Sequence, residues 1–354
     1  MTDLEKLCSR VTEAADCAVI TDDVNRRYFT AMKSSAGTLV VFPEKAYFII
    51  DFRYIEKAKK TVTACEVILQ DKLYEQINSL IKKHGAKTVS VNADTCTLSE
   101  LIAYQQKLNA EVIADTKLAE IIREIRTVKS QEQIDKIIKA QRIAEKGFAH
   151  MLDFIKVGRT EKEIQLELDY YMLKNGAEAL SFDTIALSGS NTSLPHGVPS
   201  DKKVESGEFV LMDFGATYDG WHSDMTRTVC VGKPSDKMKS VYETVLTAQL
   251  SALDAVKAGM SGKALDKIAR DIITKAGYGD NFGHSLGHGV GVEIHESPYA
   301  SPSREDILPE NSIVTVEPGI YLEGKFGVRI EDFVVVTENG CINMTKAPKE
   351  LICL

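Results

Sequence analysis

The sequence has no long apolar run and no excess of positive charge, and each absence excludes a class of protein. No stretch approaches the roughly 18 apolar residues of a membrane-spanning helix, and the charged N-terminus MTDLEKLCSR lacks the apolar core of a signal peptide. With 51 acidic and 43 basic residues, the net charge of −8 disfavours binding to nucleic acid or to an anionic membrane. We therefore expect a cytoplasmic protein that acts on a small molecule or a peptide.

Neither the cysteines nor any nucleotide-binding motif provides a candidate site. The seven cysteines are scattered, odd in number and without a CxxC pair, so we expect reduced, mostly buried thiols with no metal or nucleophilic role. The sequence also lacks a phosphate-binding loop and a GxGxxG segment after a strand. Nucleoside triphosphatases and dinucleotide enzymes are therefore disfavoured.

The first part of the chain predicts an α/β domain over residues 1–124. Its strand-like runs are CAVI at 17, TLVVF at 38, AYFII at 46 and KTVSV at 87. Between them, residues 71–85 read as an amphipathic helix closed by Gly85. The polar residues of this domain show no convergent pattern, so we expect a structural or oligomerising role.

A second domain, residues 125–354, contains an internal repeat. Ser130 and Gln133 form a capping-box signature for its first helix. Further on, KVGRTEKEIQLELDYYMLKNG (156–176) and KAGMSGKALDKIARDIITKAG (257–277) align without gaps as two capped helices that end at glycine. Two copies indicate a duplicated half, and a pseudo-twofold domain commonly has its site between the halves.

Two aspartates face the same way on a predicted hairpin. In FVLMDFGATYDGWHSDMTRTVCV, Asp219-Gly220 is a strong two-residue turn signal, and counting back from it places Asp213 opposite Thr226. Asp224 lies two residues from Thr226, so both aspartates point to one face, about 7 to 8 Å apart. They could converge on a pair of cations, or they could merely face solvent.

Two glutamates stand in apolar β-runs near the C-terminus. Glu317 follows the strand in TVEPGIY, and Glu331 lies within GVRIEDFVVV. A buried ionised carboxylate costs several kcal/mol unless it is paired or binds a metal, so both call for a cation. A simple salt bridge to Arg329, which would share a strand face with Glu331, is the competing explanation.

Histidine is concentrated in GHSLGHGVGVEIHE (283–296), which holds three of the seven histidines. With His288 as the one imidazole, the carboxylates above make a donor set suited to two ions of manganese, cobalt or zinc. Two such metals lower the pKa of a bridging water and polarise a carbonyl, which suits amide hydrolysis.

Three further histidines are candidates for contact with substrate. His284 and His295 would be free to donate a hydrogen bond or carry a proton, although a structural hydrogen bond explains either one alone. His196 lies in SGSNTSLPHGVPSD, a polar loop of the kind that commonly carries binding residues, where an exposed histidine is the alternative.

The ordered motifs resemble the pita-bread metallopeptidases, within them the proline-specific branch of Xaa-Pro aminopeptidases (aminopeptidase P) and Xaa-Pro dipeptidases (prolidases). SLPHG, DFGA, SDMTRT, HSLGHGVGVEIHE, VEPGIY and GVRIED occur in the family order, and SAG, DFRY and NRRYFT resemble its N-terminal domain. The resemblance implies an α+β protein with a creatinase-like N-terminal α/β domain, a pseudo-twofold pita-bread catalytic domain and usually a homodimer.

Carried over by position, the resemblance implies a complete site. The residues expected to hold two divalent ions, manganese by preference, are Asp213, Asp224, His288, Glu317 and Glu331. Asp224 and Glu331 would bridge the ions, while Glu317 would also act as general base. Arg329 would support the bridging glutamate. The histidines expected to steady the scissile amide and the developing tetrahedral charge are His196, His284 and His295.

The function implied first is an Xaa-Pro aminopeptidase, which uses a metal-bridging water to release one residue from short peptides with proline in second position. The alternative is an Xaa-Pro dipeptidase. Many prolidase-like sequences have a basic residue just after the HExP segment, whereas HESPYASPSRED has Tyr299 there and Arg304 further along. This departure favours the aminopeptidase.

Three other readings of the same fold are disfavoured. A catalytically inactive binding protein and an enzyme of creatinase-like, metal-free chemistry would each lack several of the five ligands. A methionine aminopeptidase would not explain the N-terminal α/β domain or the SLPHG match.

Overall fold

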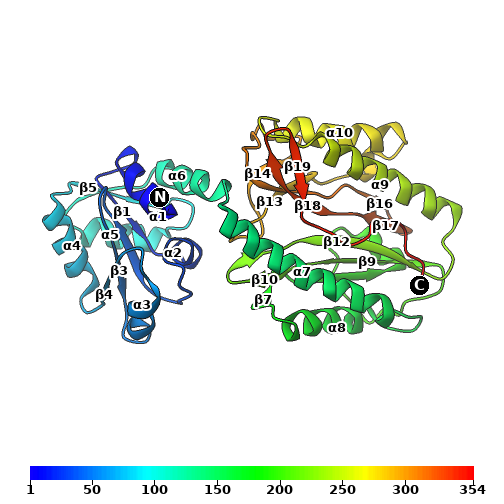
Figure 1. The fold of residues 1–354 in the computed structure, drawn as a ribbon, viewed down its shortest axis with the longest axis horizontal. Helices are drawn as coiled ribbons and strands as arrows, with labels where there is room; N and C mark the ends of the chain where they lie inside the picture. The colour runs from blue at the N-terminus through cyan, green and yellow to red at the C-terminus, as the bar shows by residue number, and fades with distance from the viewer. The chain divides into compact units, whose positions relative to one another are not determined.

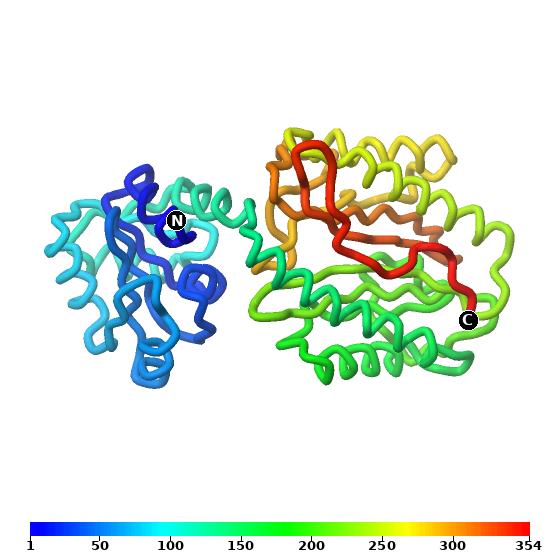
Figure 2. The backbone as a smooth tube through the Cα atoms, viewed as in Figure 1, coloured from blue at the N-terminus to red at the C-terminus, as the bar shows by residue number.

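The computed structural model describes residues 1–354 and divides them into two compact units, Met1–Arg126 and Thr127–Leu354. Each unit has its own set of strands (Figures 1 and 2). Each also has its own core of buried apolar side chains. None of the helices combines the length and the hydropathy that a bilayer span requires.

The N-terminal unit is a six-stranded mixed sheet with the order β4-β3-β2-β1-β5-β6. Its strands are β1 (Cys17–Ile20), β2 (Thr38–Val41), β3 (Ala46–Ile50), β4 (Glu66–Leu69), β5 (Thr88–Val91) and β6 (Glu111–Ile113). Its helices are α1 (Asp3–Arg10), α2 (Asp23–Thr30), α3 (Ile55–Thr61), α4 (Leu73–His84), α5 (Leu98–Lys107) and α6 (Lys117–Thr127), with a short η1 (Val11–Glu13). This is the α/β domain that the sequence predicted.

Burial on both faces of the sheet explains why the predicted strands read as unbroken apolar runs. Within β1, Ala18 and Ile20 join one core cluster, whereas Cys17 and Val19 join the cluster on the other face. All four predicted strands are present as β1, β2, β3 and β5. The predicted helix is α4, and Gly85 ends it in the left-handed conformation with φ of 69°.

The second unit contains four long helices and short, mostly antiparallel strands. The helices are α7 (Gln131–Phe154), α8 (Glu161–Lys174), α9 (Asp236–Ala255) and α10 (Gly262–Lys275), with short η2 (Gly189–Ser193) and η3 (Gly279–Asn281). The strands of its first half are β7 (Ala179–Leu180), β8 (Ile185–Ser188), β9 (Glu208–Phe214), β10 (Ala216–Tyr218), β11 (Trp221–His222) and β12 (Met225–Val231). Those of its second half are β13 (Gly287–Gly289), β14 (Glu296–Ala300), β15 (Ile313–Val316), β16 (Gly319–Leu322), β17 (Phe326–Arg329), β18 (Asp332–Thr337) and β19 (Gly340–Asn343).

The predicted repeat appears as a pseudo-twofold arrangement. In Figure 1 the pair α7 and α8 lies along one side of the strands and the pair α9 and α10 along the other. Thr160 caps α8 and Ser261 caps α10, each accepting from a backbone N–H three residues on. Matching backbone bonds anchor the two helices, from Gly158 N to Val204 O at 2.9 Å and from Gly259 N to Leu308 O at 2.9 Å.

The predicted hairpin and its register are confirmed. Tyr218 pairs with Trp221 and Asp213 with Thr226. The turn residues have positive φ, 49° for Asp219 and 82° for Gly220, as a two-residue hairpin with the twist of its strands requires.

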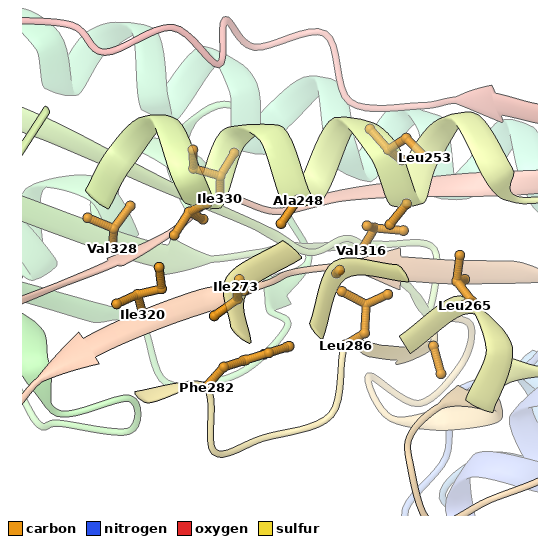
Figure 3. Close-up of a cluster of buried hydrophobic side chains, with 14 of the residues drawn as sticks. Ala248, Leu253, Leu265, Ile273, Phe282, Leu286, Val316, Ile320, Val328 and Ile330 are labelled. Atoms are coloured by element: carbon orange, nitrogen blue, oxygen red, sulfur yellow. The ribbon is translucent and has the colours of Figure 1, made fainter. Parts of the chain in front are cut away.

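Core packing in the second half aims the polar residues of the site. The buried cluster in Figure 3 includes Val316 and Ile330, which pack among residues of α9 and α10. Because side chains alternate along an extended backbone, burying Val316 turns Glu317 away from this cluster. Burying Ile330 does the same for its two neighbours, Arg329 and Glu331.

Candidate metal centre and active site

The five predicted metal ligands come from five elements and line one cavity of about 800 Å³. They lie near the end of β9 (Asp213), before β12 (Asp224), in β13 (His288), after β15 (Glu317) and before β18 (Glu331). The two halves meet at this point, since the backbone N–H of Glu331 donates to the carbonyl of Thr226 at 3.1 Å.

His288 stands at the centre of the carboxylates. Its ligand atom and those of Asp224 and Glu331 all lie within 4.8 Å of one another. Its Nε2 is 3.6 Å from Asp224 Oδ2 and 3.4 Å from Glu317 Oε1, while its Nδ1 lies 3.0 Å from the carbonyl of Gly289. A proton on Nδ1 satisfies that carbonyl and leaves the Nε2 lone pair facing the carboxylates, which is the tautomer a metal ligand needs.

Two buried carboxylate oxygens have no hydrogen-bond donor. Asp213 Oδ2 accepts from Arg329 at 2.6 Å and Glu331 Oε2 from the Thr226 hydroxyl at 2.7 Å, but Asp213 Oδ1 and Glu331 Oε1 have no partner. Unsatisfied buried oxygens are rare and costly. Since these two share a cavity with the other oxygen donors and with the imidazole of His288, the residues fit divalent cations.

The electrostatics of the cavity lead to the same conclusion. Burial raises the pKa of Asp224 well above its usual range, and the charges of Asp213 and Glu317 raise it further. Burial likewise raises the pKa of Glu331, with Asp224 adding to it, and raises that of Glu317 to about 8 against the opposing charge of Arg329. Four carboxylates therefore crowd around a single guanidinium, an imbalance that bound cations would relieve.

Arg329 does not pair with Glu331, so the salt bridge considered as a competing explanation is wrong. Its Nη2 donates to Asp213, and its Nε donates to the hydroxyl of Thr226 at 3.0 Å. That hydroxyl in turn donates to Glu331. The arginine therefore reaches the glutamate only through a threonine, and the charge of Glu331 still needs a cation.

The three predicted substrate-side histidines line the same cavity. Burial lowers the pKa of His284 to about 4, with the charge of Arg329 adding to the effect, so its ring is neutral at pH 7. Burial also lowers the pKa of His295, whose ring centroid lies 4.3 Å from that of His288 in an edge-on contact. His196 lies on the loop after η2, next to Pro195 and Gly197, which also line the cavity.

Tyr321 belongs to the site but was not predicted from the sequence. Its buried hydroxyl lies 2.9 Å from His284 Nε2 and accepts from Arg329 at 2.8 Å, so it joins the histidine to the arginine of the site. Two glycines make room for the ring, because a Cβ at Gly319 or Gly327 would approach Tyr321 to 2.4 Å or 2.8 Å. A tyrosine between glycines on paired strands was the only signal in the sequence.

Ser285 is the centre of GHSLG, which has the GxSxG spacing of a hydrolase nucleophile elbow. The segment leads into strand β13 and not into a helix. It therefore lacks the strand-turn-helix context that exposes such a serine, and the spacing alone does not indicate a serine hydrolase.

Known proteins match both units. Residues 135–338 match the metallopeptidase family M24, and residues 4–128 match the creatinase/prolidase N-terminal domain. The Xaa-Pro dipeptidase of Pyrococcus furiosus is 40% identical over 352 residues, which is 99% of each chain. Among solved structures, an Xaa-Pro dipeptidase from Bacillus anthracis has 42% identity, a TM-score of 0.95 and 99% coverage of both chains. An X-Pro aminopeptidase from Thermotoga maritima has 38% identity and a TM-score of 0.91, covering 96% of this chain and 98% of its own.

Proposed function

We propose that this chain, which belongs to metallopeptidase family M24, is an Xaa-Pro dipeptidase that depends on two divalent ions. Its family makes it a hydrolase acting on peptide bonds, with the creatinase-like and pita-bread domains that the motifs implied. The observation that carries the dipeptidase is full-length similarity, at 40% and 42% identity, to two proteins of that name. The sequence motifs favoured the aminopeptidase, whereas these relatives support the dipeptidase alternative better.

The proposed metal ligands are His288 and the four carboxylates that line the cavity with it. Asp213, Asp224, Glu317 and Glu331 supply hard oxygen donors, and His288 presents Nε2. Bound there, two ions, manganese by preference with cobalt or zinc as options, would supply Lewis acidity toward the scissile carbonyl and an acidified water. In this assignment Asp224 and Glu331, whose ligand atoms lie within 4.8 Å of each other and of that of His288, would help to hold both ions.

Glu317 is the proposed general base. The Thr315 hydroxyl donates to its Oε1 at 3.1 Å and fixes its orientation. In the metal-free protein burial raises the pKa of Glu317 to about 8; the positive charge of bound ions would lower it, so that the carboxylate could accept a proton from the attacking water near neutral pH.

The histidines and their partners are proposed to act on the substrate. His196, His284 and His295 would hold the scissile amide and stabilise charge on its oxygen as the tetrahedral state forms. Arg329 and Tyr321 would hold His284 in place through the hydrogen bonds already described. An Xaa-Pro bond has no amide N–H, so these contacts would have to recognise the carbonyl and the proline ring.

An Xaa-Pro aminopeptidase is the second candidate, favoured by the charges around the cavity. A dipeptide places its C-terminal carboxylate next to the proline ring. Among the lining residues Arg329 is the one guanidinium, and it already pairs with Asp213. The similarity to the Thermotoga maritima X-Pro aminopeptidase supports the same candidate. A longer peptide would put its carboxylate outside the cavity.

We also propose that the protein works as a cytoplasmic homodimer in which the N-terminal unit contributes to assembly. The family resemblance carried by the sequence motifs supports this proposal. Light scattering of the purified chain tests it, and a monomer at micromolar concentration would contradict the dimer.

The test of function is cleavage of Gly-Pro and Gly-Pro-Ala by metal-stripped protein, before and after addition of Mn²⁺. Manganese-dependent cleavage of Gly-Pro with little action on Gly-Pro-Ala supports the dipeptidase. Release of glycine from the tripeptide at an equal or higher rate supports the aminopeptidase. Gly-Ala serves as control, since equal cleavage of Gly-Ala would contradict proline specificity in both candidates.

A further inference from the structure

Among the buried carboxylates outside the metal centre, three each hold a segment that carries a substrate-side histidine. They are Glu161, Asp266 and Glu296, with 0%, 1% and 7% of their surface exposed. We infer that they are positioning residues, each fixing the backbone of one histidine. The inference rests on the proposed function of those histidines.

Glu161 closes the loop of His196. It is the first residue of α8, and its Oε1 accepts from the backbone N–H of Ser188 at 2.7 Å while its Oε2 accepts from that of Ser200 at 3.0 Å. The amide of Asn191 donates to both oxygens, at 3.1 and 3.2 Å. One carboxylate therefore holds both ends of the segment 188–200 that presents His196 to the cavity.

Asp266 plays the matching part for His284, through Arg270. The guanidinium binds the carboxylate with two bonds of 2.7 and 2.8 Å and donates to the carbonyls of Phe282 and His284, each at 2.8 Å. The other contact of Asp266 is with the backbone N–H of Leu286 at 3.0 Å. The segment 282–286 is thus held on both sides of the histidine.

Glu296 follows His295 directly and fixes the turn before it. Its Oε1 pairs with Lys129 at 2.6 Å in a buried ion pair, and its Oε2 accepts from the backbone N–H of Glu293 at 3.3 Å. The fit against the turn is close, because a Cβ at Gly291 would come within 2.2 Å of the carboxylate.

The contacts of these carboxylates argue that positioning, and not packing alone, accounts for them. Glu161 begins α8 and Asp266 is the fifth residue of α10, so they occupy different positions of the two repeated helices, yet each reaches the histidine segment of its own half. A buried carboxylate is costly, and a displacement of about 1 Å in a positioned group lowers a rate by roughly 10². Six hydrogen bonds join the segment 188–200 to the carboxylate of Glu161, as expected if the position of this segment must be fixed.

The decisive experiment is a double-mutant cycle in the manganese-loaded enzyme. Glu161→Gln replaces one acceptor by an NH₂ group that faces the donors of the loop, and we expect kcat/KM for the cleaved peptide to fall roughly 10- to 100-fold. In a His196→Ala background the same change should lower kcat/KM by less than about 3-fold, because the histidine through which Glu161 acts has been removed. In a His284→Ala background Glu161→Gln should lower kcat/KM by the same factor as in the wild type.

Two measurements exclude a general effect on the fold. Manganese stoichiometry by calorimetry should be unchanged in Glu161→Gln. Glu145→Gln is the matched control, because Glu145 is also mostly buried, with 12% of its side chain exposed, and accepts from the backbone N–H groups of Lys346 and Ala347, which are outside the site. Equal losses in all histidine backgrounds, or an equal loss in the control, would overturn the inference.

Amide hydrogen exchange separates this inference from the proposed function. If the wild-type enzyme cleaves no Xaa-Pro peptide, the proposed function fails, but Glu161→Gln must still speed exchange in residues 188–200 and leave residues 282–286 unchanged. Unaltered protection of 188–200 would refute the positioning of that loop. Should the glutamine variant not fold, Ser200→Ala replaces it in both measurements with a smaller expected effect. This change removes the 2.6 Å hydroxyl bond to Glu161 and the hydroxyl that accepts from the backbone N–H of Lys202 at 3.2 Å.

Discussion

Replacing Glu317 with glutamine should stabilise the metal-free protein while abolishing its activity. The side chain is 16% exposed, and the charge of Asp213 opposes its ionisation. Glutamine keeps the size of the side chain and an oxygen for the Thr315 hydroxyl, but it carries no charge. The substitution therefore removes an electrostatic cost from the empty site and a ligand from the loaded one.

The size of the effect follows from the pKa. Folding raises the pKa of Glu317 from 4.5 to about 8, so between these values the folded chain keeps a proton that the unfolded chain has released. The free energy of unfolding of the wild type must fall as pH rises through this window. At 1.36 kcal/mol per unit, the contribution is on the order of 4 kcal/mol, present below the unfolded pKa and lost by pH 8. Glutamine has no such dependence.

The assay is urea unfolding of the metal-free wild type and Glu317→Gln at pH 5 and pH 8, followed by circular dichroism. The variant should be the more stable protein at pH 8 by that order of magnitude, and the difference should nearly vanish at pH 5. Adding Mn²⁺ should reverse the ranking, because only the intact site gains binding free energy in the folded state. A less stable variant at pH 8 without metal, or a difference independent of pH, would refute the reasoning.

Three further substitutions test the site. Asp224→Asn should lower manganese stoichiometry and abolish peptide cleavage with an unchanged circular dichroism spectrum; near wild-type hydrolysis would contradict the two-metal assignment. His284→Ala should keep the metal but lower kcat by roughly 10² to 10⁴, and unchanged turnover would make this histidine structural. Tyr321→Phe should lower kcat roughly 10-fold or more, since a hydrogen bond to a charged group contributes about 1.5 to 3 kcal/mol. Steady-state kinetics of the Tyr321→Phe, His284→Ala double variant should show a loss of kcat smaller than the product of the losses in the two single variants. A loss equal to that product would mean that Tyr321 acts independently of His284.

The fold could be predicted where burial leaves a simple pattern in the sequence. Strands buried on both faces, such as β1 and β3, are apolar throughout and were found. The edge strands β4 (EVIL) and β6 (EVI) were missed, because they are short, only partly buried and begin with a charged residue. At an edge the pairing partner, not the sequence, decides that a segment is a strand.

The same distinction applies to the residues of the site: those with an unusual local sequence could be predicted, and those that depend on distant partners could not. A carboxylate inside an apolar strand is anomalous wherever it occurs, so Asp213 and Glu331 could be found from their neighbours alone. Glu161 could not, because an acidic residue in the first turn of a helix is ordinary, and the groups that donate to its carboxylate lie 27 to 39 residues away. Its role depends on a loop closure that no local pattern records.

Spatial arrangement also weakens the sequence argument against the dipeptidase. In the sequence, Tyr299 stands where many prolidase-like sequences have a basic residue after the HExP segment. In the structure its ring lines the cavity and carries the guanidinium of Arg304 at 4.1 Å from the ring centroid. Asp306 lies 3.4 Å from Arg304 Nε and offsets part of that charge. A cation thus lies beside position 299 although the residue there is aromatic, so the tyrosine alone does not argue for longer peptides, and the choice between substrates depends on whether a C-terminal carboxylate reaches this arginine.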